Sequence, residues 1–138
     1  MRLLAAPAET RTFTSTVVPT ADSTMLYKAA IERYFNAYIQ ADTDTLLDSL
    51  DPDGPMYPQP AAIEQLRATA SGNALQGEAV VKDITVVEES ADKAQVEVTL
   101  YMRVDIYSNG NFREETSYPI CELRLKDGKW RLFDVKIQ

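Results

Sequence analysis

The feature that most constrains the fold is a strict alternation of apolar and polar side chains over residues 94–107. Apolar side chains occupy every second position: Val96, Val98, Leu100, Met102, Val104 and Ile106. The positions between them hold Gln95, Glu97, Thr99, Tyr101, Arg103 and Asp105. Successive side chains of a strand point to opposite faces of its sheet. The pattern therefore predicts a long strand with one buried face and one open face, as in antiparallel sheets.

Three further stretches complete a predicted four-stranded antiparallel meander: residues 80–88, 112–125 and 130–137. Asn-Gly within residues 108–111 and Asp-Gly within residues 126–129 predict tight hairpin turns, because these dipeptides supply the positive φ that such turns require. Pro119 cannot donate to a strand ladder, which predicts an edge position or a bulge near it. The last stretch is apolar on both faces and predicts an inner strand or a second covered face.

Residues 24–40 have the spacing of an amphipathic helix. Apolar side chains recur there at three- and four-residue intervals: Leu26, Ala30, Ile31, Tyr34, Phe35, Tyr38 and Ile39. Asp22 and Ser23 precede this stretch as candidate N-caps, since their side-chain oxygens can accept hydrogen bonds from the unpaired amides of a first turn.

A second, shorter helix is expected after a break, capped by Asp42 or Thr43 and buried along Leu46, Leu47 and Leu50. Residues 51–60 contain four prolines, which fix φ and prevent a helix, so a structured loop is predicted. Pro60 is placed to begin a third helix and Gly72 to end it. Three helices followed by a meander predict an α+β fold, with the helices packed on one face of a curved sheet.

The chain divides into an arm and one domain. Residues 1–20 carry no helical period and are expected to form a flexible arm, whereas residues 21–138 form the predicted domain. The apolar run before Pro7 is shorter than a signal-peptide core. This favours a cytoplasmic protein, or an exported one if a signal peptide was removed or truncated. No stretch approaches the roughly twenty apolar residues of a membrane helix.

The composition excludes several classes of chemistry. The chain has no histidine, which removes Ser-His-Asp triads, Cys-His pairs and imidazole metal sites. Its single cysteine, Cys121, excludes an internal disulfide and is interpreted as a buried structural thiol. A formal net charge of −7 repels phosphate backbones and anionic membranes, so no nucleic-acid partner is expected.

An acidic cluster, made of Asp42, Asp44, Asp48, Asp51 and Asp53, raises the question of a calcium loop. Gly54 follows Asp51 by three places instead of five, and no glutamate closes a twelve-residue loop. Helix caps and a solvated face are the preferred interpretation. No metal site and no cofactor are predicted.

Four motifs carry a family resemblance: the tyrosine-rich first helix, residues 41–47, residues 50–57 and the closing residues 127–137. Together, over about residues 24–138, they resemble the nuclear transport factor 2-like superfamily. This cone-shaped fold is shared with ketosteroid isomerase and polyketide cyclases. The superfamily contains enzymes, ligand binders and association domains, so the resemblance alone does not fix a function. Its catalytic members use a pocket aspartate with an oxyanion donor, or a pocket histidine, which this chain lacks.

In that superfamily the first helix, the loop after the second helix and the last strand border the interior of the cone. The resemblance therefore implies that Tyr34, Tyr38, Tyr57 and Trp130 line one cavity, and the alternative is that they fill the core. Asp134 alternates in phase with Trp130, so a straight strand would place the Asp134 carboxylate beside the Trp130 ring. Desolvation would then make it a general acid or base. The alternative is a solvated Asp134, or one paired with Lys136 or Arg103.

The polar face of residues 94–107 is a candidate interface, formed by Thr99, Tyr101, Arg103 and Asp105. The resemblance implies that this face pairs two protomers, and tyrosine and arginine are enriched in such contacts. Ordinary solvent exposure is the alternative. The function favoured by the sequence is a noncatalytic, homodimeric module that binds a small apolar or peptide-like ligand or holds an assembly together. The alternative is a cofactor-independent isomerase, dehydratase or cyclase that uses Asp134 and a pocket tyrosine.

Overall fold

The structure is a computed structural model that describes residues 21–105 and 111–137. Three helices come first: α1 (Ala21–Gln40), α2 (Thr43–Asp48) and α3 (Pro60–Asn73). Five strands follow: β1 (Gln76–Glu89), β2 (Lys93–Asp105), β3 (Phe112–Ser117), β4 (Pro119–Lys126) and β5 (Lys129–Ile137). The predicted α+β fold is confirmed, with five strands instead of four. The expected arm and residues 106–110 of the predicted second strand and turn lie outside the described residues.

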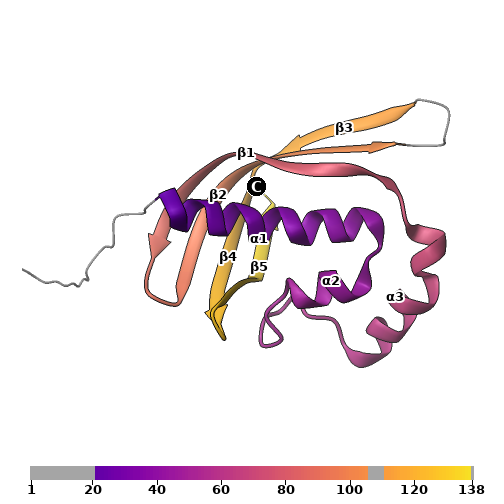
Figure 1. Ribbon diagram of the computed structural model, residues 1–138, viewed down its shortest axis with the longest axis horizontal. Helices are drawn as coiled ribbons and strands as arrows, with labels where there is room; N and C mark the ends of the chain where they lie inside the picture. Colours follow the sequence, from indigo (N-terminus) through magenta and orange to yellow (C-terminus); the bar gives the residue numbers. More distant parts are fainter. Residues whose placement is uncertain (1–20, 106–110, 138) are drawn as a thin grey trace, which may run out of the picture.

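The helices and the sheet form two layers. The strand order is β1-β2-β4-β5, with β3 also paired to β2, and every pairing between these strands is antiparallel. In Figure 1, α1 crosses one face of the sheet, α2 lies below the C-terminal half of α1, and α3 lies to the right of α2. No helix among residues 21–105 and 111–137 is long and apolar enough to cross a membrane.

The core lies between α1 and the inner face of the sheet. The alternation predicted for β2 is confirmed, because Val96, Val98 and Leu100 are no more than 3% exposed. Tyr27 and Ile31 reach this layer from α1. The burial predicted for Cys121 is also confirmed, and its burial raises the pKa of the thiol to about 12. A thiol with so high a pKa stays protonated and unreactive at neutral pH.

The expected third strand is divided at Pro119 into β3 and β4. Leu100 pairs with Ser117, and Glu97 pairs with Ile120, so both strands advance by the same number of residues and none is inserted. Pro119 thus interrupts the ladder to β2 without creating a bulge there. It is not at an edge either, because β4 lies between β2 and β5. The prediction of an edge position at Pro119 was wrong.

The outer edge of β5 is covered by the segment that follows α2. Leu50 and Leu132 form a parallel bridge, Asp51 N donates to Leu132 O at 2.8 Å, and Leu132 N donates to Ser49 O at 2.9 Å. β5 is therefore the last strand of the described sheet, with a covered edge. Of the two predicted alternatives, an inner strand or a second covered face, the inner strand was wrong. Gly54 fits this close approach, because a Cβ there would lie 2.5 Å from Phe133 O.

The N-terminal ends of α1 and α2 test the capping residues predicted from the sequence. α1 already includes Ala21, so the expected N-caps Asp22 and Ser23 lie inside the helix and that prediction was wrong. Asp42 does cap α2, and its carboxylate accepts hydrogen bonds from the backbone and side chain of Thr45.

The third helix and the last hairpin follow their signals closely. Pro60 begins α3 as predicted, but the helix runs to Asn73 and so includes Gly72. The turn between β4 and β5 has Asp127 at φ 54° and Gly128 at φ 75°, which confirms the predicted tight hairpin.

Candidate functional site

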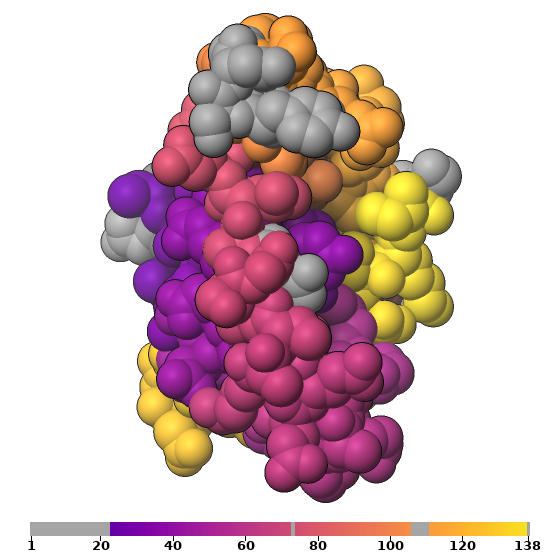
Figure 2. Space-filling view, turned by 90° about the vertical axis from the view of Figure 1, so that its right-hand side faces the viewer, coloured from indigo at the N-terminus to yellow at the C-terminus, as the bar shows by residue number. Residues whose placement is uncertain are grey.

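A pocket of about 360 Å³, called the α3 pocket below, lies where the end of α1 meets α2, α3 and β2. It is lined by Tyr38, Ile39, Ala41, Thr43, Leu46, Leu66, Ala70, Leu75, Met102 and Val104. Leu75 N donates to Ile39 O at 3.0 Å, which fastens the link between α3 and β1 to the end of α1. Figure 2 shows the outer surface of α3, with the start of β1 above it.

The lining of the α3 pocket is almost entirely hydrocarbon. Its side-chain hydrogen-bonding groups are the phenol of Tyr38 and the hydroxyl of Thr43, and none of its lining side chains carries a charge at neutral pH. The Tyr38 side chain is 65% exposed, which places it at the mouth. An apolar cavity of this size with a few polar groups is the usual environment of a small neutral ligand.

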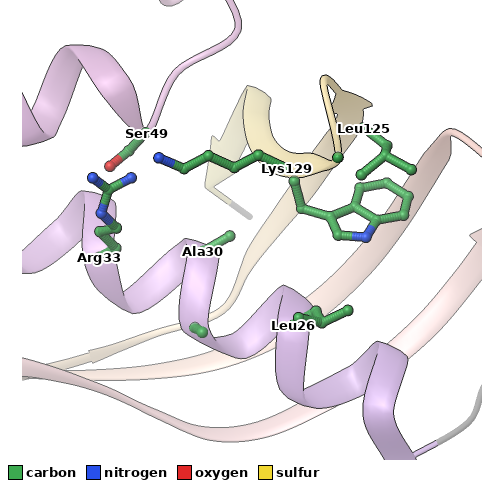
Figure 3. Close-up of a pocket in the computed structure, with 9 residues that line it drawn as sticks. Leu26, Ala30, Arg33, Ser49, Leu125 and Lys129 are labelled. Atoms are coloured by element: carbon green, nitrogen blue, oxygen red, sulfur yellow. The ribbon is translucent and has the colours of Figure 1, made fainter.

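A second cavity of about 460 Å³, the α1–hairpin groove, lies between the N-terminal half of α1 and the β4–β5 hairpin. It is lined by Leu26, Ala29, Ala30, Arg33, Ser49, Leu125, Gly128, Lys129 and Trp130. In Figure 3 the polar ends of Arg33, Ser49 and Lys129 gather at one end of the groove, whereas Leu26 and Leu125 lie toward the other. This cavity is therefore apolar along its length and cationic at one end.

A third depression, the polar cleft, lies beside α2 and includes Tyr57, Arg67 and Asp53 in its walls. Asp51, between the lining residues Leu50 and Pro52, is 1% exposed, although the sequence suggested a solvated face. Burial alone would raise the pKa of its carboxyl. Hydrogen bonds from the Asp53 backbone N–H and the Lys126 ammonium outweigh that effect and lower the pKa. Because Asp51 is hydrogen-bonded by Asp53 and Lys126, we interpret these polar residues as stabilising the fold and not as a ligand site.

The structure distributes the predicted pocket residues among different environments. Trp130 lines the α1–hairpin groove, Tyr38 the α3 pocket and Tyr57 the polar cleft. Tyr34 is partly buried and packs edge-to-face against Phe35, and burial raises the pKa of its phenol. The described cavities therefore do not bring these four side chains together in one site.

Asp134 lies on the opposite face of the sheet from Trp130, because β5 is not straight. Glu122 pairs with Asp134, whereas the next residue, Leu123, pairs with Leu132, so Phe133 is an extra residue in β5. A bulge of this kind reverses the alternation beyond it. Asp134 borders a small depression with Gln95, Ile120, Glu122 and Lys136, and its carboxylate accepts from Val135 N at 2.9 Å.

The candidate interface residues share the outer face of β2, as the alternation predicted. Tyr101 donates to the carboxylate of Glu114 on β3, and Arg103 stacks over the ring of Phe112 at 4.0 Å. Arg103 also lies 3.6 Å from the carboxylate of Asp105. The side chain of Phe112 is 45% exposed. This face therefore presents an aromatic and cationic stripe, whose role in pairing remains a prediction.

Sequence reasoning missed two groups of residues around the groove. Tyr27 is 1% exposed, donates a short hydrogen bond to Glu89 and packs edge-to-face on Trp130. Burial, and then the Glu89 carboxylate, raise the pKa of its phenol. Arg33 and Lys129 were not singled out because they lie far apart in the sequence. A helical stripe of Leu26, Ala29 and Arg33 was the only local signal.

Residues 13–138 match the model described as the C-terminal domain of the anti-sigma-I factor RsgI9. The chain belongs to this family. The family match begins before α1, within the expected arm. No curated protein matches the chain.

Solved structures with the same fold are diverse. A cystatin-like protein of unknown function from Nostoc punctiforme is 17% identical, with TM-score 0.63, and the match covers 86% of this chain and 91% of that one. Aln2 from a Streptomyces species is 18% identical, with TM-score 0.66 and 88% and 94% covered. The association domain of C. elegans CaMKII is 18% identical, with TM-score 0.64 and 85% and 95% covered. At these identities the likeness shows the fold alone, and it confirms the cystatin-like fold that the resemblance implied.

Proposed function

We propose that this domain is a noncatalytic binding module whose α3 pocket takes a small, neutral, apolar ligand. The observation that carries the proposal is the lining of the α3 pocket, where hydrocarbon surrounds a cavity of about 360 Å³ and the polar groups are one phenol and one hydroxyl. Such a lining offers shape and apolar contact but no acid-base pair. The match to a domain of an anti-sigma factor also supports a regulatory role over an enzymatic one.

The placement of Asp134 weighs against the alternative of an isomerase, dehydratase or cyclase. Its carboxylate borders a depression on the outer face, with Glu122 and Lys136, and the α3 pocket is lined by other residues. A general base must come within hydrogen-bond reach of the proton that it removes. Turnover of an enolisable ketone that is lost in Asp134→Asn, with folding intact, would overturn the noncatalytic proposal.

The proposal is tested with the neutral fluorescent probe N-phenyl-1-naphthylamine. We expect saturable binding that is lost in Ala70→Phe, because the added ring fills the pocket from α3. Ala68→Phe is the matched control, since Ala68 is an exposed position of the same helix and does not line the pocket. Equal loss of binding in both variants, or no binding by the parent protein, would contradict the proposal.

We also propose that the outer face of β2 pairs two copies of the domain. The stacked side chains of Arg103 and Phe112, together with Tyr101, favour it, because a partly exposed aromatic stripe with a polar rim is typical of moderate interfaces. Tyr101→Glu combined with Arg103→Glu places like charges across a two-fold axis. Sedimentation should shift toward the 15.4 kDa monomer while circular dichroism is retained. A monomeric parent protein at high micromolar concentration would refute the pairing.

A further inference from the structure

The α1–hairpin groove has two walls of different origin. Leu26, Ala29, Ala30 and Arg33 are spaced three or four residues apart, so they lie along one face of α1. The facing wall is the β4–β5 hairpin, which contributes Leu125 and Trp130. The two alanines carry short side chains, and the space they leave becomes the body of the cavity.

The cationic end of the groove holds more positive than negative charge. Arg33 Nη2 lies 2.7 Å from Asp48 Oδ2, and the Lys129 ammonium donates to the same oxygen. Arg131 approaches the other oxygen of Asp48 at 3.6 Å, and both of these residues line the neighbouring polar cleft. Three cations therefore share this one carboxylate, so positive charge exceeds negative charge among these four residues.

The two cations that line the groove are partly exposed, Arg33 at 38% and Lys129 at 40%, so a ligand in the groove can reach them. The chain as a whole is strongly acidic, with a net charge of −7, so an anion gains little from its general field and needs a local attraction. Arg33 contacts Asp48 through Nη2, and a guanidinium carries further N–H donors in a planar fork that suits a carboxylate. Two cations that share one partner can each donate a charge-assisted hydrogen bond to a second anion.

We propose that the α1–hairpin groove binds an apolar monocarboxylate, with its carboxylate at Arg33 and Lys129 and its hydrocarbon body along the apolar walls. The volume of about 460 Å³ is within the range of small-molecule sites. The negative charge of the ligand would offset part of the excess positive charge around Asp48. This site is separate from the α3 pocket, so the inference does not depend on the proposed function.

The chain supplies its own reporter for this site. Trp130 is the only tryptophan and lines the groove, so its fluorescence responds to an occupant. Titration with decanoate should give a saturable change in emission. Decan-1-ol, which keeps the chain and loses the charge, should bind at least about tenfold more weakly, because charge-assisted hydrogen bonds are lost. Decyltrimethylammonium, which reverses the charge, should not bind.

Removing the cations and removing their carboxylate partner, Asp48, should change the affinity for decanoate in opposite directions. Arg33→Gln with Lys129→Gln should weaken decanoate by at least about tenfold and leave decan-1-ol unchanged. Asp48→Asn should instead tighten decanoate, because it removes the carboxylate that competes for the same cations. Arg67→Gln is the matched control, since Arg67 pairs with Asp44 at 2.7 Å in the polar cleft, and it should change nothing in the groove.

Several outcomes would overturn the proposal. Decanoate that binds no more tightly than decan-1-ol shows that the cations do not recognise the head group. Weaker decanoate binding in Asp48→Asn, with circular dichroism retained, would also show that the cations do not recognise the head group. This test does not depend on whether the Arg33→Gln, Lys129→Gln double variant folds. Binding that disappears in Ala70→Phe places the ligand in the α3 pocket. Failure of N-phenyl-1-naphthylamine to bind would refute only the proposed function.

Discussion

The two apolar cavities lie at opposite ends of α1 and are walled in different ways. The α3 pocket is closed by a helix with no buried side chain at its described positions, held by a backbone hydrogen bond at Leu75 and an exposed Arg67–Asp44 pair. The α1–hairpin groove is backed by the fully buried Tyr27 and tied by the ion pairs of Asp48. The wall of the α3 pocket can therefore adjust to a ligand, whereas the wall of the α1–hairpin groove is part of the framework of the fold.

The largest effect on stability is expected from Trp130→Ala, which tests whether the wall of the α1–hairpin groove is part of the framework. Trp130 is partly buried and packs edge-to-face on Tyr27, with ring centroids 5.0 Å apart. Removing the ring loses its apolar transfer energy and leaves a cavity beside the core, which should lower the free energy of unfolding by about 3 kcal/mol. Urea denaturation followed by circular dichroism measures this loss. A change below about 1 kcal/mol would show that the groove wall is not part of the framework.

A smaller effect is expected from acid titration of Asp48. Hydrogen bonds from Lys129 and Arg33 hold the pKa of its carboxyl well below its usual value. Its ionised form therefore stabilises the folded state at neutral pH, and this contribution is lost as the pH falls below about 3.9 toward the folded pKa. Because the side chain is 42% exposed, solvent screening limits the contribution to about 1 kcal/mol or less.

The measurement compares the parent protein with Asp48→Asn. The difference in their free energies of unfolding should be largest near neutral pH and should narrow on acidification. A difference that stays constant from neutral to acidic pH would show that Asp48 acts through shape or packing and not through its charge.

The fold could be predicted from the sequence to the extent that its signals are local. The alternation that buries Val96, Val98 and Leu100, the cap at Asp42 and the turn at Asp127-Gly128 each act over a few residues. The covered edge of β5 could not be predicted in this way, because it depends on Leu50 meeting Leu132 across the fold.

The candidate sites were predicted less well, for the same physical reason. The cationic end of the groove joins Arg33, Asp48 and Lys129 from three separate elements, and their spacing carries no local pattern. The extra residue Phe133 reversed the expected side of Asp134, and a bulge inside an apolar strand leaves no clear mark in composition. Residue types and periodicity therefore identified the layers, whereas the cavities depend on long-range pairing.

The smallest expected effect is that of Leu66→Ala in α3. The side chain of Leu66 is 38% exposed and lines the α3 pocket, so its removal enlarges a cavity that is already open to solvent. Little apolar area returns to water, and the free energy of unfolding should fall by only about 0.5 kcal/mol. Binding of N-phenyl-1-naphthylamine should nevertheless weaken, because the same side chain forms the wall that contacts the probe. A loss of stability as large as that of Trp130→Ala would show that α3 is part of the framework, and the contrast between the two cavities would no longer hold.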